Sequence, residues 1–290
     1  MASIDFILNL AGLLFWLNWR SLGSDPLARA TPATLAGTVR RAEPRRIKGW
    51  HLLLWLALLL FLRAVLYWQL GSSINWTAHL HLNVVSLPFR SDLFNRMLLF
   101  SVLSFALVLG MFYLCLLLLS LLNGRSPEAD PLQKLVRLHL GPIDGWVWPV
   151  KMILPLLVVT PIWLLLSGLL AGQSIIGAAP LNLRLQQGLV IGLSVYLSWQ
   201  YLIIGLLVFY LLASYIYFGN HPFWTFINAS ARHLLAPFRR PPLRLGKIDL
   251  APLLVIVGVL VVAQFARSGL TLLYARLPLV ESRSGSVMLR

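Results

Sequence analysis

Long apolar stretches alternate with short polar ones along the chain and predict membrane-spanning helices. A helix needs about 20 mostly apolar residues to cross a bilayer. Six stretches meet or approach this length, at 4–19, 50–70, 94–122, 148–171, 189–218 and 251–275. The first is short, and the third and fifth are long enough to tilt or to project from the bilayer. We therefore expect an all-α integral membrane protein with six transmembrane helices.

The loops between these stretches differ in charge. Loop 20–49 carries seven Lys and Arg residues, loop 124–147 carries three and loop 219–249 carries five, whereas each intervening loop carries one. Because Lys and Arg gather in cytoplasmic loops, we expect the three basic loops in the cytoplasm. Both termini, including a tail over 276–290, are then extracytoplasmic.

The same succession of segments occurs three times and predicts three helical hairpins. In each, an apolar helix is followed by a turn residue and a proline, an amphipathic connector, a polar segment and a second apolar helix. The three predicted units cover 1–71, 72–172 and 173–275. Asp before Pro suits a helix start, because the carboxylate caps the helix and Pro fits its first turn. The turn pairs are Asp25-Pro26, Asp130-Pro131 and His221-Pro222.

The connectors on the cytoplasmic side are amphipathic. Residues 223–235 gather apolar side chains on one face, and in 132–137 the apolar Leu135 and Val136 lie opposite the polar Gln133. Such helices either lie on the lipid headgroups or pack beneath the bundle.

The second and third units also share the pattern Gly-x-Ile-Asp, at 141–144 and 246–249, just before a predicted span. A carboxylate stabilises the N-terminus of a helix. We therefore expect Asp144 and Asp249 to cap those spans, with a chemical role as the alternative.

The outer loops alternate apolar and polar residues at 78–84 and 180–185. A period of two is typical of a strand, so we expect these segments to pair as a small extracytoplasmic β-ribbon. His79 and His81 share one face of the first strand. They offer two metal ligands, but no third ligand is near them in the sequence, so we expect no metal site.

Composition supports a membrane protein and narrows the choice of partners. Charged residues make up 11% of the chain and hydrophobic residues 59%, whereas soluble domains average about 25% charged residues. The net charge of +15 fits cytoplasmic loops beside anionic lipid headgroups, and we expect no nucleic-acid partner. The single cysteine, Cys115, excludes an intrachain disulfide. We also expect no cofactor.

Two arginines inside predicted spans form a candidate intramembrane polar site. Arg63 and Arg267 occupy similar late positions in the second and sixth spans, and Gln264 lies on the same face as Arg267. Charge within the membrane is costly and marks functional sites. The arginines either extend to the outer headgroups or line a shared cavity that binds an anion or a lipid headgroup. We expect no Asp or Glu inside the spans to neutralise them.

The stretch 220–254 carries a specific combination of residues. It holds Pro222-Phe223, Phe226, a Leu-x-x-Pro ending at Pro237, Arg239-Arg240, Pro241-Pro242, and Gly246-x-Ile248-Asp249-Leu250 followed by Pro252. This combination resembles the YggT family, also called YlmG, in which Ser usually stands at the position of Ala251. The second unit keeps Asp130-Pro131 and Gly141-x-Ile143-Asp144, and the first keeps Asp25-Pro26; both are similar to degraded copies of the third.

The resemblance implies a bacterial inner-membrane or plastid thylakoid protein, a family usually built from one or two such units. Roles associated with the family include cell division and nucleoid distribution, osmotic-stress tolerance linked to potassium uptake, and assembly of haem-containing photosynthetic complexes. None of these roles comes with established catalytic residues, so the resemblance implies no active site, and we expect no enzyme.

The basic loops and the repeated motif supply the remaining candidate residues. The cations that we assign to lipid or partner binding are Arg40, Arg41, Arg45, Arg46, Arg239, Arg240, Arg244 and Lys247. The residues that we assign to the structural motif are Asp25, Pro26, Asp130, Pro131, Asp144, Pro222, Pro237, Gly246, Asp249 and Pro252.

Two hypotheses of function follow from these patterns. The first is a membrane scaffold or assembly subunit that holds anionic lipid and a membrane-protein partner, or a second copy of itself. The second is a channel or transporter for a small ion or osmolyte. It rests on Arg63, Arg267 and the two prolines of the fourth span, Pro155 and Pro161, which are expected to kink the helix.

Overall fold

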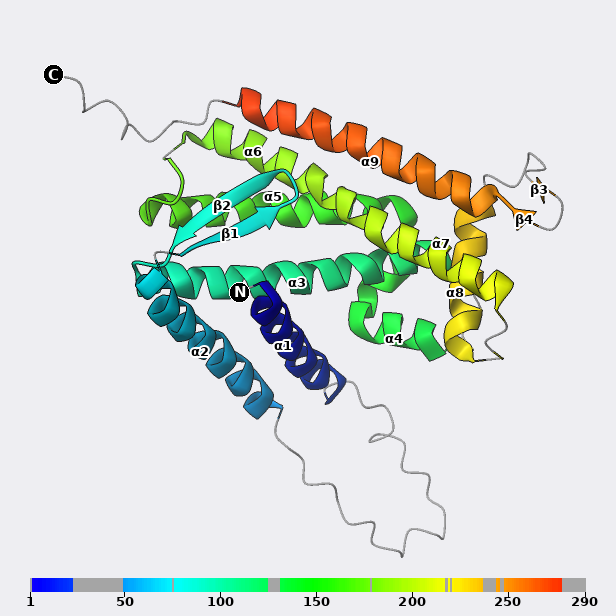
Figure 1. The fold of residues 1–290 in the computed structure, drawn as a ribbon, viewed down its shortest axis with the longest axis horizontal. Helices are drawn as coiled ribbons and strands as arrows, with labels where there is room; N and C mark the ends of the chain where they lie inside the picture. Colours follow the sequence, from blue (N-terminus) through cyan, green and yellow to red (C-terminus); the bar gives the residue numbers. More distant parts are fainter. Residues whose placement is uncertain are drawn as a thin grey trace, which may run out of the picture. The chain divides into compact units, whose positions relative to one another are not determined.

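The computed structural model describes residues 2–22, 49–74, 76–124, 131–177, 179–216, 219, 221–236, 244–245 and 248–277. The chain is mostly helical (Figure 1). It divides into two compact units. The N-terminal unit comprises 1–78 and 89–110, and the C-terminal unit comprises 79–88 and 111–290. The division into three repeated hairpins stays a prediction.

The N-terminal unit is built from α1 (Ala2–Leu22), α2 (Trp50–Ile74) and the first part of α3 (Phe94–Asn123). Helix α1 packs on α2, and an aromatic group around Tyr67 lies in the core. The Tyr67 ring centroid is 5.5 Å from that of Trp76 and 5.9 Å from that of Phe100. Near the end of α2, the backbone at Gly71 lies close to Ser91. A Cβ added at Gly71 would be only 2.5 Å from the Cβ of Ser91.

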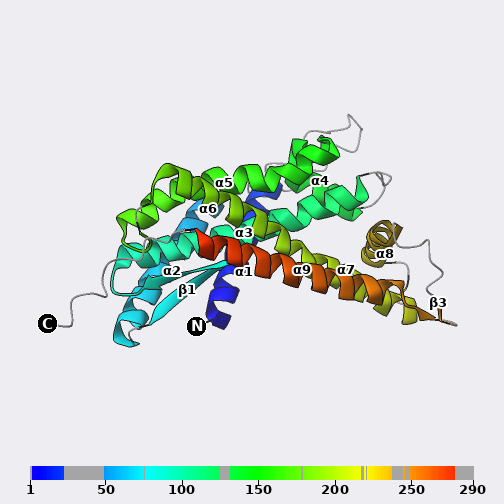
Figure 2. The ribbon, with the colours of Figure 1, turned by 90° about the horizontal axis from the view of Figure 1, so that it is seen from above.

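The C-terminal unit contains the rest of α3 and the described helices that follow it. They are α4 (Pro131–Leu140), η3 (Gly141–Gly145), α5 (Trp148–Gly172), α6 (Leu181–Ser194), η4 (Val195–Ser198), α7 (Trp199–Tyr215), α8 (Pro222–Leu235) and α9 (Ala251–Arg276). Helices α6 and α7 are joined through η4 into one apolar stretch of 35 residues, Leu181–Tyr215. Helix α9 runs beside α7, as Figures 1 and 2 show.

Glycines let two helices of the C-terminal unit come close together. At Gly192 of α6 an added Cβ would lie 2.8 Å from Cδ1 of Leu156 in α5, and at Gly188 it would lie 3.3 Å from Thr160. The Thr160 hydroxyl donates a hydrogen bond of 3.4 Å to the Gly188 carbonyl. Small residues at such crossings are typical of helix pairs in membranes.

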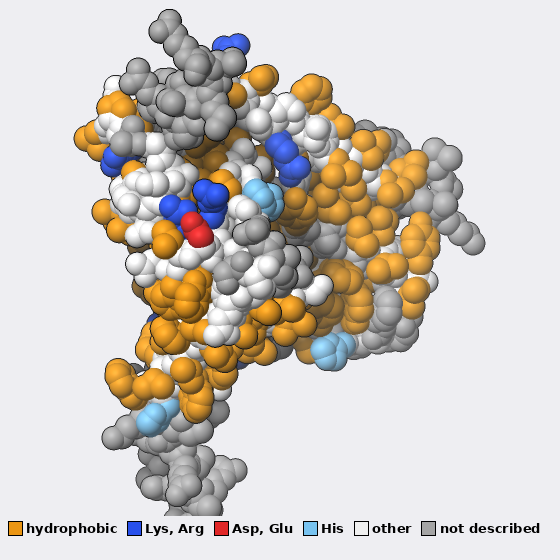
Figure 3. Space-filling model, turned by 60° about the vertical axis from the view of Figure 1, so that its left-hand side comes forward, with side chains coloured by type: hydrophobic (Ala, Val, Ile, Leu, Met, Phe, Trp, Pro, Cys, Tyr) orange, Lys and Arg blue, Asp and Glu red, His pale blue; other side chains and the backbone are white. Residues whose placement is uncertain are grey.

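Five of the described helical segments are long and apolar enough to cross a membrane. They are Trp50–Gly71, Phe94–Asn123, Trp148–Gly172, Leu181–Tyr215 and Ala251–Arg276. Helix α1, which carries Asp5 and Arg20, is not among them. On the face shown in Figure 3, hydrophobic side chains predominate and charged ones are few. The chain is thus a multi-pass membrane protein by length and composition, and a sixth span and the side on which each terminus lies stay predictions.

The β-ribbon forms, but with a different partner from the expected one. Strand β1 (Thr77–Leu82) joins β2 (Val85–Arg90) in a two-stranded sheet, and Asn83 in the turn has a φ of 54°. The predicted strand at 180–185 is wrong, because residues 181–185 form the first turns of α6. Pro180 is the N-cap of that helix, and a proline placed there leaves no unpaired donor.

The alternation in β1 is confirmed. Ala78 and Leu80 are buried, while His79 and His81 are exposed on one face with ring centroids 6.3 Å apart. In the described part of the chain, no group of three or more His, Cys, Asp and Glu side chains is placed to hold a metal ion.

The two amphipathic connectors are helices, α4 and α8, and each buries one face against neighbouring helices. Phe226 and Ile227 of α8 are buried, as the pattern predicts. In α4 the prediction is confirmed for Val136, which is buried, and wrong for Gln133, which is buried, and for Leu135, which is 49% exposed. Gln133 can be buried because its Nε2 donates a hydrogen bond of 2.7 Å to the carbonyl of Asn123.

Candidate functional site

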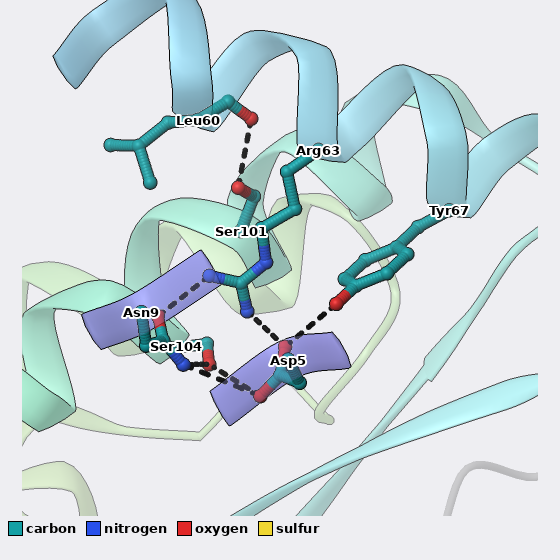
Figure 4. Close-up of polar contacts among 7 residues, drawn as sticks. All are labelled: Asp5, Asn9, Leu60, Arg63, Tyr67, Ser101 and Ser104. Carbon is teal, nitrogen blue, oxygen red and sulfur yellow. Dashed lines mark hydrogen bonds and ion pairs between the residues drawn. The ribbon is translucent and has the colours of Figure 1, made fainter. Parts of the chain in front are cut away.

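The candidate intramembrane site at Arg63 is a closed polar network in the N-terminal unit (Figure 4). Asp5 and Asn9 are one turn apart on α1, and Arg63 and Tyr67 are one turn apart on α2. Residues four apart lie on the same face of a helix, so each pair points the same way. Helix α3 adds Ser104.

Every member of the network is hydrogen-bonded to another. Arg63 Nη2 forms an ion pair with Asp5 Oδ1, and Arg63 Nη1 donates to Asn9 Oδ1 at 2.6 Å. The Tyr67 hydroxyl donates to Asp5 Oδ1 at 3.0 Å, and the Ser104 hydroxyl donates to Asp5 Oδ2 at 3.2 Å. Asn9 Nδ2 in turn donates to Ser104 Oγ at 3.0 Å and to Asp5 Oδ2 at 3.4 Å. The Asp5 carboxylate therefore receives donors from three helices.

Burial makes this network energetically important. The Arg63 side chain is 0% exposed and the Asp5 side chain 29% exposed. The guanidinium carbon also lies 5.4 Å from the centre of the Tyr67 ring, within the range of a cation–π contact. Of the nitrogens of this side chain, only Nε has no hydrogen-bond partner among the described residues. A buried charge of this kind is tolerated because its partners replace water.

Two expectations about Arg63 are thereby corrected. The side chain does not extend to the headgroups, because it is sealed among α1, α2 and α3. An acidic residue does neutralise it, and that residue is Asp5. The signal was present in the sequence, since Asp5 lies in the first turn of the first apolar stretch.

Arg267 has a different environment, in the C-terminal unit. It is half-buried on α9, and its Nη2 donates to the Tyr201 hydroxyl of α7 at 3.4 Å. Gln264 is exposed. A cavity shared by the two arginines stays a prediction, because Arg63 and Arg267 belong to different compact units.

A second polar cluster gathers around Asp144 in the C-terminal unit. The Asp144 carboxylate accepts hydrogen bonds from the Ser120 hydroxyl and from Arg137 Nε, the latter at 3.1 Å. The Lys151 side chain is 6% exposed. Its Nζ donates to Ser120 Oγ at 2.8 Å and to the Asp144 carbonyl at 2.6 Å, and it lies 3.9 Å from Asp144 Oδ1.

This cluster corrects the role that the motif suggested for Asp144. The N-cap of α5 is Val147, with no side-chain capping bond, so Asp144 does not cap the helix. Instead its carboxylate neutralises the buried Lys151 of α5. This role stabilises the fold more than a helix cap would, because an unpaired buried charge is costly. In the third predicted repeat, the prediction for Asp249 is also wrong, because the N-cap of α9 is Leu250.

Short polar side chains tie α3 to α8 near the same cluster. Asn123 Nδ2 donates to the Ser230 hydroxyl at 2.6 Å, and Asn123 Oδ1 lies 3.3 Å from His233 Nδ1. Asn123 and Ser230 are buried, and the sequence reasoning missed them both. Their signal is weak, because isolated Ser and Asn residues inside apolar helices are common.

An apolar groove lies between α6–η4–α7 and α9 in the C-terminal unit. Its volume is about 1080 Å³, and it is lined almost entirely by apolar side chains, among them Trp199, Val255 and Val262. Gln200 is the one amide in its lining. Such a groove does not suit ion coordination, because it offers few polar ligands.

The remaining motif residues lie at helix starts or outside the described residues. Helix α4 begins at Pro131, α8 begins at Pro222 after an N-cap His221, and Pro252 is buried in the first turn of α9. Arg244 pairs with Asp249 in the backbone register of β3 (Arg244–Leu245) and β4 (Ile248–Asp249). The candidates outside the described residues are Asp25, Pro26, Arg40, Arg41, Arg45, Arg46, Asp130, Pro237, Arg239, Arg240, Gly246 and Lys247.

Comparison with known proteins adds one finding. The CCB3/YggT family matches residues 188–270. This segment takes in the second half of α6, all of η4, α7 and α8, and most of α9. The resemblance predicted from 220–254 is confirmed within it. Neither a curated protein nor a solved structure matches the chain.

Proposed function

Starting from residues 188–270 as a CCB3/YggT segment, we propose that the chain is a non-enzymatic scaffold or assembly subunit of a larger membrane complex. The complex serves division, membrane organisation, or assembly of a respiratory or photosynthetic complex. The chain resides in a bacterial inner membrane, or in a thylakoid-type membrane, with its basic loops in the cytoplasm. Its partners are anionic lipids and another membrane protein, not a nucleic acid.

The observation that supports a scaffold is that Arg63 is buried and hydrogen-bonded within the fold. A channel for anions or osmolytes needs charged or polar groups that face a water-filled path. Arg63 is 0% exposed and fully engaged with Asp5 and Asn9 through its two terminal nitrogens. A charge used in this way holds three helices in one arrangement, which is what a scaffold requires of its own fold.

Lipid contact is the second part of the proposal. The loops expected in the cytoplasm carry seven, three and five cations, and each cation near an anionic surface contributes about 1 kcal/mol. A few of them at a time suffice to fix the orientation of the protein. This attraction falls as ionic strength rises.

The test is purification from native membranes in a mild detergent, followed by mass spectrometry and size-exclusion chromatography. We expect a stoichiometric membrane-protein partner that is absent when an unrelated multi-pass protein of similar abundance is purified in the same way. A lone protomer in every mild detergent would refute the proposal.

A flux assay separates the scaffold from the channel. Proteoliposomes loaded with chloride, potassium or a neutral osmolyte should leak no faster than empty liposomes. Flux above that background, reduced in Arg63→Ala or Arg267→Ala, would establish the channel hypothesis instead.

A further inference from the structure

Helix α9 is much less covered by the rest of the chain than the other apolar spans. In its most apolar window only 11% of residues are buried, whereas the other four spans have 22% to 28%. One side of α9 lies on α7 and α8 through Val255. It also contacts α6 and η4, but most of its apolar surface stays uncovered in the described part of the C-terminal unit.

The groove beside α9 has the length of a membrane span. Its lining extends along α9 from Ala251 to Leu273, which is about 33 Å at 1.5 Å per residue. The hydrocarbon core of a bilayer is about 30 Å thick. The volume of about 1080 Å³ lies at the upper end of small-molecule pockets, which hold about 300–1,000 Å³. These dimensions favour a rod that crosses the membrane over a compact ligand.

Small residues on α9 leave its backbone accessible from the groove. Ala251, Gly258, Ala266 and Gly269 all line it. A Cβ added at Gly258 or Gly269 would meet nothing within 4 Å, so there is open space next to the main chain at both positions. Small residues of this kind let the backbone of a second helix approach closely.

Gln200 is the independent observation that points to an occupant. Its side chain lines the groove, the residue is only 9% exposed, and its amide, which forms no hydrogen bond among the described residues, is accessible from the groove. Gln200 lies near the middle of the apolar stretch Leu181–Tyr215, where no bulk water is available. An amide that faces hydrocarbon without a partner is costly, and a lipid acyl chain cannot satisfy it.

We propose that the groove between α6–η4–α7 and α9 receives one transmembrane helix of another protein, which presents small residues to α9 and a hydrogen-bonding side chain to Gln200. The inference rests on the proposed scaffold function and names the class of partner and its binding site. A second copy of this chain is the competing occupant, and the experiment below distinguishes the two.

Photo-crosslinking tests the site directly. A benzoylphenylalanine replaces Val262, which lines the groove and is 68% exposed. In the matched control it replaces Leu165 of α5, which is 76% exposed and lies outside the groove lining. After irradiation of native membranes, peptide mass spectrometry identifies what is attached. We expect an apolar span of another membrane protein at Val262 and no such adduct at Leu165.

Two variants test the contacts within the groove. Gln200→Leu should lower the cross-linking yield by about threefold or more, the effect of one interhelical hydrogen bond. Gly258→Leu should abolish the cross-link, because its side chain fills the space that the partner needs. Both variants should elute and melt like the parent protein, because Gln200 forms no hydrogen bond among the described residues and a Cβ at Gly258 meets nothing within 4 Å.

The outcomes separate this inference from the function on which it rests. A partner that co-purifies but cross-links at Leu165 would overturn the groove assignment and leave the scaffold standing. Adducts of this chain's own peptides, or of lipid only, at Val262 would also overturn it. A yield unchanged by Gln200→Leu would overturn the hydrogen-bond assignment, and a chain with no partner at all would overturn both proposals.

Discussion

The ion pair between Asp5 and Arg63 makes an asymmetric prediction about stability. Asp5→Leu leaves the Arg63 guanidinium buried at 0% exposure, and removing one partner of a buried pair costs about 3–5 kcal/mol. Arg63→Met leaves Asp5, whose side chain is 29% exposed and keeps its hydrogen bonds from Tyr67 and Ser104. We expect that change to cost less, about 1–3 kcal/mol.

The double variant should recover most of the loss. With both charges gone, the apolar side chains pack without an unpaired ion, and replacements of this kind are often neutral or stabilising. We expect Asp5→Leu/Arg63→Met to lie within about 2 kcal/mol of the parent, because Asn9 and Tyr67 lose partners. The coupling energy between the two sites is then at least about 2 kcal/mol.

The assay is equilibrium unfolding in mixed micelles, followed by tryptophan fluorescence. Trp76 is a useful reporter because its ring lies 5.5 Å from that of Tyr67. The matched control is Asp92→Asn, which removes an ion pair of 3.5 Å between Asp92, 56% exposed, and Arg96. An exposed pair of this kind contributes about 0–1 kcal/mol. The reasoning is refuted if Asp5→Leu costs no more than Asp92→Asn, or if the coupling is below about 1 kcal/mol.

Three further variants test packing and polar contacts elsewhere. Gly71→Ala should destabilise by about 1–3 kcal/mol because its new Cβ has no room, whereas Gly110→Ala, with nothing within 4 Å, should be neutral or stabilising in the same melt. Asp144→Asn should lower the free energy of unfolding by about 2–4 kcal/mol, because it leaves Lys151 without a counter-charge. Stability should return in the double variant Asp144→Asn/Lys151→Met, and a single variant as stable as the parent would contradict the pairing. Asn123→Ala should weaken the packing of α8 on α3. We expect faster proteolysis or hydrogen exchange of residues 222–235, with the protection of α5 nearly unchanged. Equal loss of protection in both helices would contradict a local role for Asn123.

Much of the helical architecture could be predicted because its cause is local. A stretch of apolar residues in lipid has to satisfy its backbone within itself, and a helix does this without help from distant residues. The five apolar spans, the amphipathic α8 and the strand β1 therefore follow the sequence pattern closely. The segment 180–185 shows the limit, because an alternation of six residues also fits the first turns of a helix that starts at Pro180.

The polar contacts could not be predicted in the same way. Residue spacing places Arg63 in a span, but its counter-charge lies 58 residues away on another helix, and only the packing of α1 on α2 brings the two together. Likewise Asp144 stands where a capping residue is expected, yet the tertiary structure directs its carboxylate to Ser120 and Lys151. The unpartnered amide of Gln200 acquires its meaning only from the groove that α7 and α9 form.

The sequence by itself thus determined that this is a helical membrane protein with a CCB3/YggT segment, because hydrophobic length and a contiguous motif are properties of neighbouring residues. Tertiary structure decided which charges are neutralised and which surface stays open. Those features depend on distances between helices, and burial raises the energetic weight of each contact far above its value in water.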